Sequence, residues 1–259
     1  MKFFILILAT VLPRLAAAQT QNPTDRDSVP VKSASILLNR GQNPPNVKSF
    51  IVPAVLISYG LVSLGNNAIR TLDYSTKNEL QEDHPLFAHH LDNYMQFVPM
   101  VAVYGLNLAG IKGKHGIVDQ TALYLLSFSI MNISTTSVKR LADRNRPDGS
   151  NNYSFPSGHT ANAFMAAEFL NQEYRDVSPW IGYAGYTVAT ATGVLRMYNN
   201  KHWLSDVVAG AGFGIASTKI VYLIYPHLRK LVIGKQSIHY SVVPTYQQKT
   251  GGLAFNGTF

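Results

Sequence analysis

Three short segments combine cationic, histidine and carboxylate side chains in an order that suits attack on a bound oxyanion. They are residues 139–147 (KRLADRNRP), 156–159 (PSGH) and 196–206 (RMYNNKHWLSD). Lysine and arginine bind oxyanions, and a histidine oriented by a carboxylate can act as a nucleophile. Together the segments predict a site that holds a tetrahedral oxyanion and attacks it.

The first segment supplies two cations. Six residues separate Lys139 from Arg146, and Pro147 ends the helical pattern. Arg146 offers a planar fork that can bind two oxygens at once, whereas Lys139 offers a point charge. Because Arg140 and Arg144 belong to the same run, an ordinary basic cluster beside an apolar helix is an equally good interpretation of this segment alone.

The second segment is a loop that enters the N-terminus of a predicted helix. Free backbone N–H groups and the helix dipole favour an anion at such a position. Gly158 lets the backbone approach closely, and Ser157 can cap the helix and donate a hydrogen bond. His159 would face the same anion, although taken alone it could be a capping or structural histidine.

The third segment places His202 six residues after Arg196, and Asp206 four residues after His202. If a helix begins at Trp203, the histidine and the aspartate lie about one turn apart on the same face. A carboxylate bonded to one imidazole nitrogen fixes the tautomer and raises the basicity of the other, which makes the histidine a nucleophile. Taken alone, a surface His–Asp pair is the alternative.

The sequence gives little support for a metal site or for a reaction at a cysteine thiol. The chain has no cysteine, which excludes disulfides, thiolate ligands and cysteine nucleophiles. His84, His89 and His90 lie in a polar link at 70–92 without a well-spaced set of carboxylates, so no metal site is predicted there.

The three segments resemble the signature of the type 2 phosphatidic acid phosphatase superfamily, which also contains vanadium haloperoxidases and bacterial acid phosphatases. The resemblance covers residues 118–225, and Leu195 departs from the serine that the family often has before the arginine. The matching patterns are Lys139-x6-Arg146-Pro147, Pro156-Ser157-Gly158-His159 and Arg196-x5-His202-x3-Asp206.

The resemblance implies His202, His159 and Asp206 as the catalytic residues. His202 attacks phosphorus and forms a phosphohistidine, Asp206 orients it, and His159 protonates the departing oxygen. No metal or other cofactor is implied, because cations neutralise the equatorial oxygens. The implied phosphate-binding residues are Lys139, Arg146, Ser157, Gly158 and Arg196.

Apolar segments around these residues predict an all-α fold, a bundle of about six helices, because they are long for strands and most lack strand-like alternation. The polar link at 70–92 predicts a short additional helix. The alternating tail predicts local β-structure, with a hairpin as the candidate. The apolar segments are Phe50–Leu64, Tyr94–Ile111, Val118–Val138, Thr160–Leu170, Trp180–Leu195 and Trp203–Tyr225.

The N-terminus predicts export, because Lys2 precedes an apolar run and a small-residue cleavage site. An uncleaved anchor is the alternative. The predicted organisation is a signal peptide at 1–18, an exposed lead-in at 19–49, a helical phosphatase domain at 50–227 with its motif core at 118–225, and a C-terminal tail at 228–259.

Composition favours a membrane-associated protein with anionic partners. Charged residues make up only 14% of the chain, against about 25% in soluble domains, although a mean hydropathy of +0.02 is low for a chain made mostly of spanning helices. The formal charge of +8 suits phosphate groups or anionic lipids. Nucleic acid is not expected, because the basic residues form no dense run.

The expected function is metal-independent hydrolysis of a phosphomonoester or pyrophosphate of a membrane lipid. Undecaprenyl pyrophosphate, phosphatidate-type lipids and lipid A phosphates are the substrates that the resemblance implies. The site is expected to face the periplasm from a membrane of the bacterial cell envelope. The alternatives are a soluble periplasmic acid phosphatase for small phosphoesters and a vanadate-dependent haloperoxidase. The sequence indicates no oligomeric state.

Overall fold

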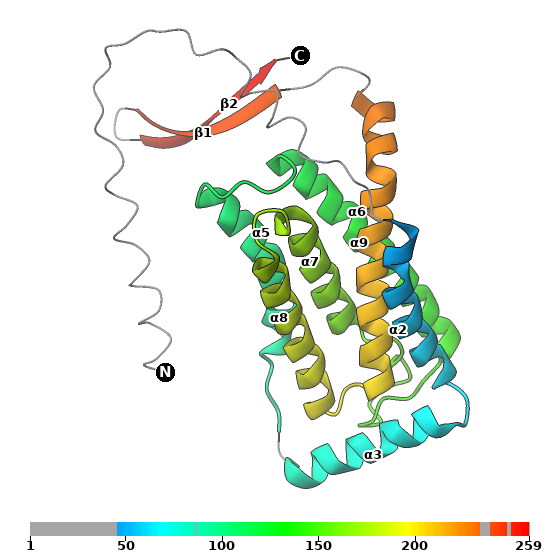
Figure 1. Cartoon of the computed structure of the whole chain (residues 1–259). Coiled ribbons are helices and arrows are strands. Elements are labelled where there is room, and N and C mark those ends of the chain that lie inside the picture. Colours follow the sequence, from blue (N-terminus) through cyan, green and yellow to red (C-terminus); the bar gives the residue numbers. More distant parts are fainter. Residues whose placement is uncertain (1–45, 86, 234–238, 248–249, 259) are drawn as a thin grey trace. The chain divides into compact units, whose positions relative to one another are not determined.

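The computed structural model describes residues 46–85, 87–233, 239–247 and 250–258, with side chains described as far as residue 231 (Figure 1). The predicted signal peptide at 1–18 and nearly all of the lead-in at 19–49 lie outside the described residues. The elements are η2 (Val47–Phe50), α2 (Ile51–Val62), α3 (Ala68–Asp83), α4 (Asp92–Met95), α5 (Val98–Leu108), α6 (Ile117–Ala142), α7 (Gly158–Tyr174), α8 (Pro179–Tyr198), α9 (Leu204–Ile233), β1 (His239–Gln247) and β2 (Thr250–Thr258).

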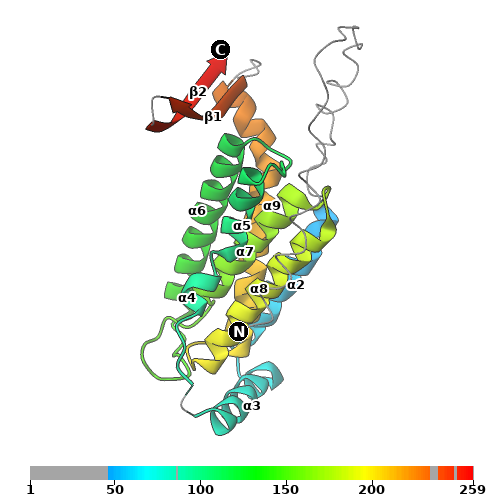
Figure 2. The ribbon, with the colours of Figure 1, turned by 90° about the vertical axis from the view of Figure 1, so that its left-hand side faces the viewer.

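The described residues form a helical bundle, which confirms the predicted all-α class. The six predicted apolar segments correspond to α2 and to α5 through α9, which run side by side (Figures 1 and 2). The strands β1 and β2 pair antiparallel within the predicted C-terminal tail, with His239 opposite Thr258 and Gln247 opposite Thr250.

The bundle is built around α7. Thirteen of its 17 residues are buried, which is expected of a helix surrounded by neighbours. It packs against α5, α6, α8 and α9. Part of its length contributes to an apolar core whose fully buried members include Phe169 and Tyr174, together with Val103 of α5 and Val221 of α9. This packing fixes α7 as the rigid element from which the PSGH segment begins.

Glycines allow α7 and α9 to approach closely. A Cβ atom at Gly214 would lie 2.2 Å from the carbonyl oxygen of Ala161, and one at Gly210 would lie 2.6 Å from that of Ser157. Any larger residue at these two positions would therefore collide with the backbone of α7. The close contact places the N-terminal ends of the two helices side by side.

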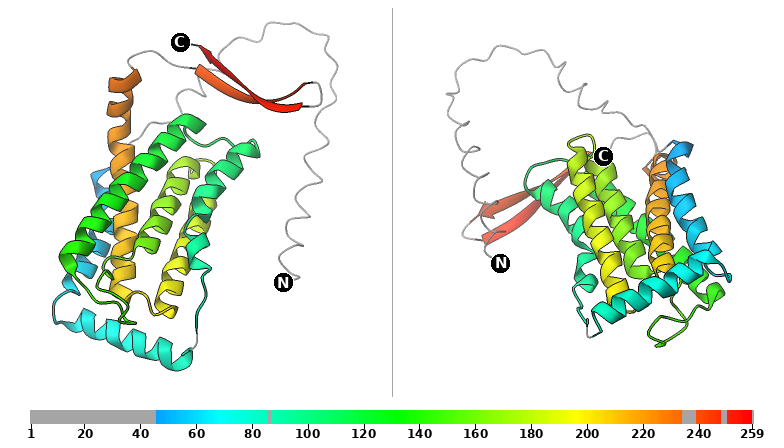
Figure 3. Two further views of the ribbon diagram at one scale, coloured as in Figure 1. Left: turned by 180° about the vertical axis from the view of Figure 1, so that it is seen from behind. Right: turned by 60° about the horizontal axis from the view of Figure 1, so that its bottom comes forward.

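The link at 70–92 contains a longer helix than predicted, and this helix crosses one end of the bundle (Figures 1 and 3). Asn67 caps α3 by accepting hydrogen bonds from the backbone N–H groups of Ile69 and Arg70. Asp73 is its one buried residue. A polar helix that buries a single carboxylate indicates a specific partner for that carboxylate, described below.

Two helix ends differ from the sequence interpretation. α6 ends at Ala142, where Asp143 takes a left-handed conformation (φ 44°), so the chain leaves the helix before Pro147. At the other end of the fold, α9 continues through Pro226 to Ile233 and extends into the segment assigned to the tail at 228–259. Tertiary packing here overrides the usual effect of an internal proline.

Within the described residues, one helical stretch, Leu204–Leu231 of α9, is long and apolar enough to cross a membrane. Of its apolar window, 61% is buried inside the bundle. The other apolar helices fail this test of length and composition, and α2 and α5 are too short.

Candidate active site

The three motif segments meet at the end of the bundle that α3 crosses. Lys139 lies in the last turn of α6, and its Nζ donates to the carbonyl oxygens of Tyr153 (3.0 Å) and Pro156 (2.5 Å) in the following loop. The backbone N–H of Ser157 donates to the carbonyl oxygen of Asp206 at 3.0 Å. These bonds join the first segment to the second, and the second to the third.

Three cations lie close enough to affect one another's charge. Burial lowers the pKa of Lys139 to about 8; Asp206 opposes this shift, and the neighbouring Arg146 and Arg196 add to it. Arg196 is buried, and its Nη1 donates to Asp92 Oδ2 at 2.5 Å. Like charges gathered in this way are stabilised by an anion placed among them.

Two of these cations keep buried donors without a protein partner. The Nε atoms of Arg146 and Arg196 make no hydrogen bond within the described residues. Buried donors are almost always satisfied, so each exception requires an explanation. Oxygens of a bound phosphate would supply the missing acceptors, since guanidinium groups bind phosphate through paired N–H donors.

His202 and Asp206 adopt the predicted one-turn relationship, because α9 begins at Leu204 between them. The distance from His202 Nδ1 to Asp206 Oδ2 is 3.6 Å, which is an ion-pair distance but longer than a hydrogen bond. Burial lowers the pKa of His202 to about 4, against the opposing effect of Asp206. His202 is therefore neutral at pH 7, as a nucleophile must be.

Asp206 is held from several directions. Its Oδ2 accepts hydrogen bonds from Ser154 Oγ (2.5 Å) and from the backbone N–H of Trp203 (2.9 Å). Its Oδ1 accepts one from Arg144 Nη1 at 2.8 Å. Because the carboxylate is fully buried, these bonds determine its orientation toward His202.

His159 lies beside the phosphate-binding cations. Its Nε2 is 2.8 Å from Asn93 Oδ1. Burial, followed by the nearby Arg196, lowers the pKa of His159 to about 4, so the imidazole is neutral at pH 7 in the absence of an anion. A phosphate dianion bound among the same cations would reverse their effect and favour the protonated form that a general acid requires.

Ser157 and Gly158 form the turn into α7. Ser157 is the N-cap residue, as predicted, but its side chain makes no cap hydrogen bond; its Oγ lies 2.9 Å from Thr160 Oγ1 instead. The prediction of a side-chain cap is therefore wrong. A Cβ atom at Gly158 would meet only Lys139 Cε, at 3.9 Å, so protein packing does not demand glycine here. The space above this residue is free for a ligand.

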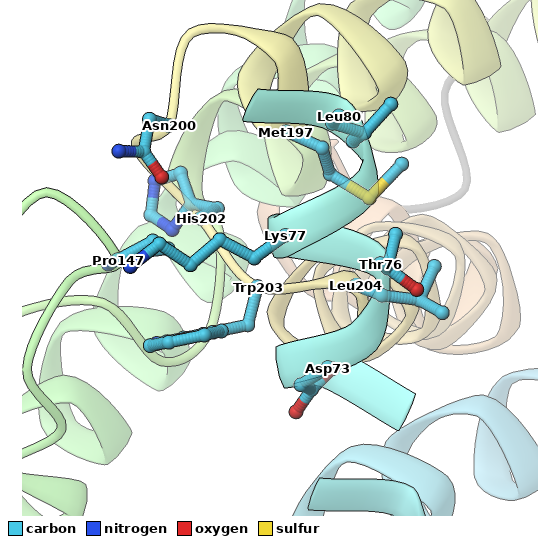
Figure 4. A pocket seen from close by; sticks show the side chains of 10 residues that line it. All are labelled: Asp73, Thr76, Lys77, Leu80, Pro147, Met197, Asn200, His202, Trp203 and Leu204. Atoms are coloured by element: carbon cyan, nitrogen blue, oxygen red, sulfur yellow. The ribbon is translucent and has the colours of Figure 1, made fainter. Parts of the chain in front are cut away.

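A small cavity lies on the α3 side of His202 (Figure 4). Its volume is about 10 Å³, room for a single water molecule. It is lined by His202, Pro147, Met197, Asn200, Trp203 and Leu204, and by Asp73, Thr76, Lys77 and Leu80 of α3. The α3 helix therefore covers one side of the candidate nucleophile.

Sequence reasoning missed the residues that hold the motif side chains in place. Arg144 was assigned to a basic run, yet it is buried and contacts Asp206. Asp92 was placed at the end of the polar link and Asn93 was assigned to no element, yet they contact Arg196 and His159, respectively. None of these residues has a distinctive spacing to the motifs, so only the fold reveals them.

Among the described residues, no group of three or more histidine, cysteine, aspartate or glutamate side chains is arranged to hold a metal ion. His84 packs against the ring of Tyr198, and the backbone N–H of His89 donates to Asn199 Oδ1. These histidines thus contact the C-terminal end of α8.

Comparisons with known proteins find similarity over the part of the chain that carries the three segments. The sequence model of the PAP2 superfamily matches residues 120–230, which include all eight predicted site residues. A lipid A 1-phosphatase of Porphyromonas gingivalis is 40% identical over 139 residues, 53% of this chain and 31% of that protein, so this chain spans about a third of its length. A lipid A 1-phosphatase of Helicobacter pylori is 26% identical over 175 residues, 65% of this chain and 86% of that protein.

Two solved structures are similar at 20% sequence identity. A transmembrane PAP2 type phosphatidylglycerolphosphate phosphatase from Bacillus subtilis has a TM-score of 0.48, covering 68% of this chain and 97% of that one. Aquifex aeolicus LpxE has a TM-score of 0.43, covering 56% and 92%. Residues 120–230 of this chain match the model of the PAP2 superfamily, and they contain all three segments of the predicted signature.

Proposed function

We propose that this chain is a phosphatase that removes a phosphate group from a membrane lipid through a phosphohistidine at His202. The observation that carries the proposal is the buried, neutral His202 beside Asp206, next to cations whose Nε donors have no protein partner. Such a site holds an anion and attacks it. The lipid A 1-phosphatases among the relatives favour a lipid A phosphate as the substrate.

The first chemical step is attack on phosphorus by the Nε2 lone pair of His202. The N–P bond forms as the bond to the leaving oxygen breaks, and His159 gives that oxygen a proton. Asp206 accepts a hydrogen bond from Nδ1–H as positive charge develops on the imidazole. The 3.6 Å separation closes by a small movement of either side chain; such bonds are often long before substrate binds.

The second step releases phosphate. Water attacks phosphorus and loses a proton to His159, while the N–P bond breaks and its electron pair returns to His202. Throughout both steps Lys139, Arg146 and Arg196 neutralise the equatorial oxygens. His159 thus ends the cycle protonated, ready for the next leaving group.

Exposed apolar side chains support contact with a membrane. They lie on several helices of the bundle and are too numerous for isolated surface residues. More than half of the surface of each is accessible in Val52 and Val55 of α2, Val101 and Leu108 of α5, Leu125 and Ile133 of α6, and Trp180 and Tyr183 of α8. With the candidate span in α9, they favour a protein embedded in a membrane of the cell envelope, with its site facing the periplasm.

The direct test is phosphate release by the purified chain in detergent, with a chelator present, from lipid A, phosphatidate and undecaprenyl pyrophosphate. Release from at least one lipid is expected, and His202→Ala should abolish it. His90→Ala is the matched control, because His90 is exposed and outside the site. Full activity of His202→Ala would sink the mechanism.

A water-soluble acid phosphatase is the second candidate, favoured by the low mean hydropathy and by the single candidate span among the described residues. Fractionation separates the two. Recovery of the chain in the soluble fraction after a high-salt wash without detergent would exclude the membrane-embedded form. Retention in the membrane until detergent is added would exclude the soluble one.

A further inference from the structure

A buried hydrogen-bonded network contacts Asp206 through its Oδ1 atom, whereas Oδ2 is the oxygen that lies 3.6 Å from His202 Nδ1. Its centre is Arg144, whose Nη1 donates to Asp206 Oδ1 (2.8 Å) and to Ser205 Oγ (2.8 Å). Its Nη2 donates to Asp73 Oδ2 at 2.7 Å. The guanidinium also lies 5.4 Å from the ring of Trp203, which fixes its plane. One cation is thus shared between two buried carboxylates.

Asp73 connects this network to the start of α9. Its Oδ1 accepts a hydrogen bond from the backbone N–H of Ser205 at 2.8 Å, and its Oδ2 accepts one from Ser205 Oγ at 2.6 Å. The N–H groups in the first turn of a helix have no partner within the helix, and a carboxylate there also interacts favourably with the helix dipole. Asp73 therefore acts as a cap for α9 that is supplied by α3.

The shared cation determines the charge that His202 experiences. If Arg144 paired with Asp206 alone, the guanidinium would largely neutralise that carboxylate. Asp73 provides a second negative charge, so one cation and two carboxylates leave one net negative charge beside the imidazole. That charge stabilises the imidazolium that forms as His202 attacks phosphorus.

We propose that Asp73 and Arg144 are a positioning pair that fixes the orientation of Asp206 and maintains a net negative charge beside His202, which raises its basicity as the nucleophile. The inference rests on the proposed function, since it assigns a role within the same reaction. Arg144 occupies an unspecified position within the first pattern, whereas Asp73 lies outside all three patterns. Asp73 contributes from α3, which lines the small cavity beside His202.

Other charged and titratable groups face the same region. Lys139 of α6 and Arg196 of α8 interact with His202 from the phosphate side. Lys77 of α3 lines the small cavity beside His202, and Tyr59 of α2 interacts with Asp73. None of these groups is changed in the variants below, so their contribution remains constant.

The test replaces Asp73 by asparagine, which preserves size and removes the charge. Two effects are expected, one on the plateau of kcat and one on the pH of the acidic limb. The plateau of kcat should fall by about tenfold, because a less basic His202 attacks more slowly, while the acidic limb of the kcat/KM profile should move to lower pH by about half a unit. A merely structural role would lower the plateau without moving the limb.

The double variant Asp73→Asn/Arg144→Gln restores the net charge by removing one negative and one positive group. Its acidic limb should return to the wild-type position. If Asp73→Asn alone does not fold, the double variant still tests the proposal. An acidic limb at lower pH in the double variant than in the wild type would overturn it. Asp83→Asn, exposed on the same helix, is the control and should change neither the plateau nor the limb.

Titration of the His202 ring by NMR provides a readout that needs no substrate. The resonance is assigned by its loss in His202→Asn. The midpoint should be lower in Asp73→Asn than in the wild type, and an unchanged midpoint would overturn the proposal. If the wild type releases phosphate from no lipid, the proposed function fails, while the NMR comparison still tests the positioning pair.

Discussion

Substitution of Gly210 by alanine should disrupt the site through the backbone. Gly210 lies on α9 where that helix passes the N-terminus of α7, and an added Cβ would lie 2.6 Å from the carbonyl oxygen of Ser157. It would also lie 3.3 Å from Thr160 Cβ and 3.4 Å from the Ala161 nitrogen. The obstacle is helix backbone rather than a flexible side-chain end, so the two helices must separate.

The required separation follows from the geometry. Ordinary contact begins at about 3.4 Å, so the Cβ–oxygen distance must grow from 2.6 Å by about 0.8 Å. His159 lies on α7, and His202 lies two residues before the start of α9, so this movement misplaces the general acid relative to the nucleophile. A misplacement of about 1 Å costs about 100-fold in rate, and overpacking costs about 1–3 kcal/mol of stability.

The assay is kcat/KM for phosphate release together with thermal unfolding in the same detergent. Gly105→Ala in α5 is the matched control, because an added Cβ there meets nothing within 4 Å. It should leave activity unchanged and stabilise the helix by up to about 1 kcal/mol. Wild-type kcat/KM in Gly210→Ala would refute the claim that close packing of α7 and α9 positions the site.

Three further outcomes are expected. Above pH 6.5 His202 is neutral in both the folded and the unfolded chain, whereas between pH 6.5 and about 4 only the unfolded chain takes up a proton at this residue. This proton alone should lower the free energy of unfolding by about 3 kcal/mol over the range, in addition to the effect of His159, whose pKa is lowered in the same direction. A pH series of denaturant melts should therefore show a smaller fall in His202→Asn than in the wild type. Orthovanadate, an analogue of the pentacoordinate transition state, should inhibit competitively. Arg196→Gln should raise the inhibition constant of vanadate at least tenfold, because a guanidinium that binds its oxygens is lost. Equal inhibition of the wild type and the variant would contradict this role of Arg196. Ser154→Ala removes the hydrogen bond to Asp206 Oδ2 and should lower stability by about 1–3 kcal/mol in chemical melts, whereas an unchanged midpoint would show that this bond contributes nothing.

The helices and the motif side chains were accessible to sequence reasoning because both depend on local spacing. Apolar runs predicted the bundle. The four-residue interval from His202 to Asp206 predicted that the two side chains lie one helical turn apart, and this prediction does not depend on the rest of the fold. The exceptions arise where packing overrides local preference. Pro226 does not end α9, and Ser157 bonds to Thr160 rather than capping α7 with its side chain.

The residues that support the motif side chains were not accessible in this way. Asp73 reaches Ser205 across 132 positions, and Asp92 reaches Arg196 across 104. Neither carboxylate follows a periodic pattern with its partner, because the contact depends on how α3 and α4 pack against the bundle. Only a three-dimensional structure distinguishes Asp73, which is buried, from Asp83 on the same helix, which is exposed.

The central claim is that His202 becomes covalently phosphorylated, and trapping that intermediate tests it most directly. The purified chain would be mixed with its lipid substrate, quenched in alkaline denaturant during turnover, and digested for mass spectrometry. We predict a phosphoryl group on the peptide containing His202, absent from His202→Ala. Turnover with no adduct on that peptide under conditions that preserve phosphohistidine, or an adduct on another residue, would contradict the account.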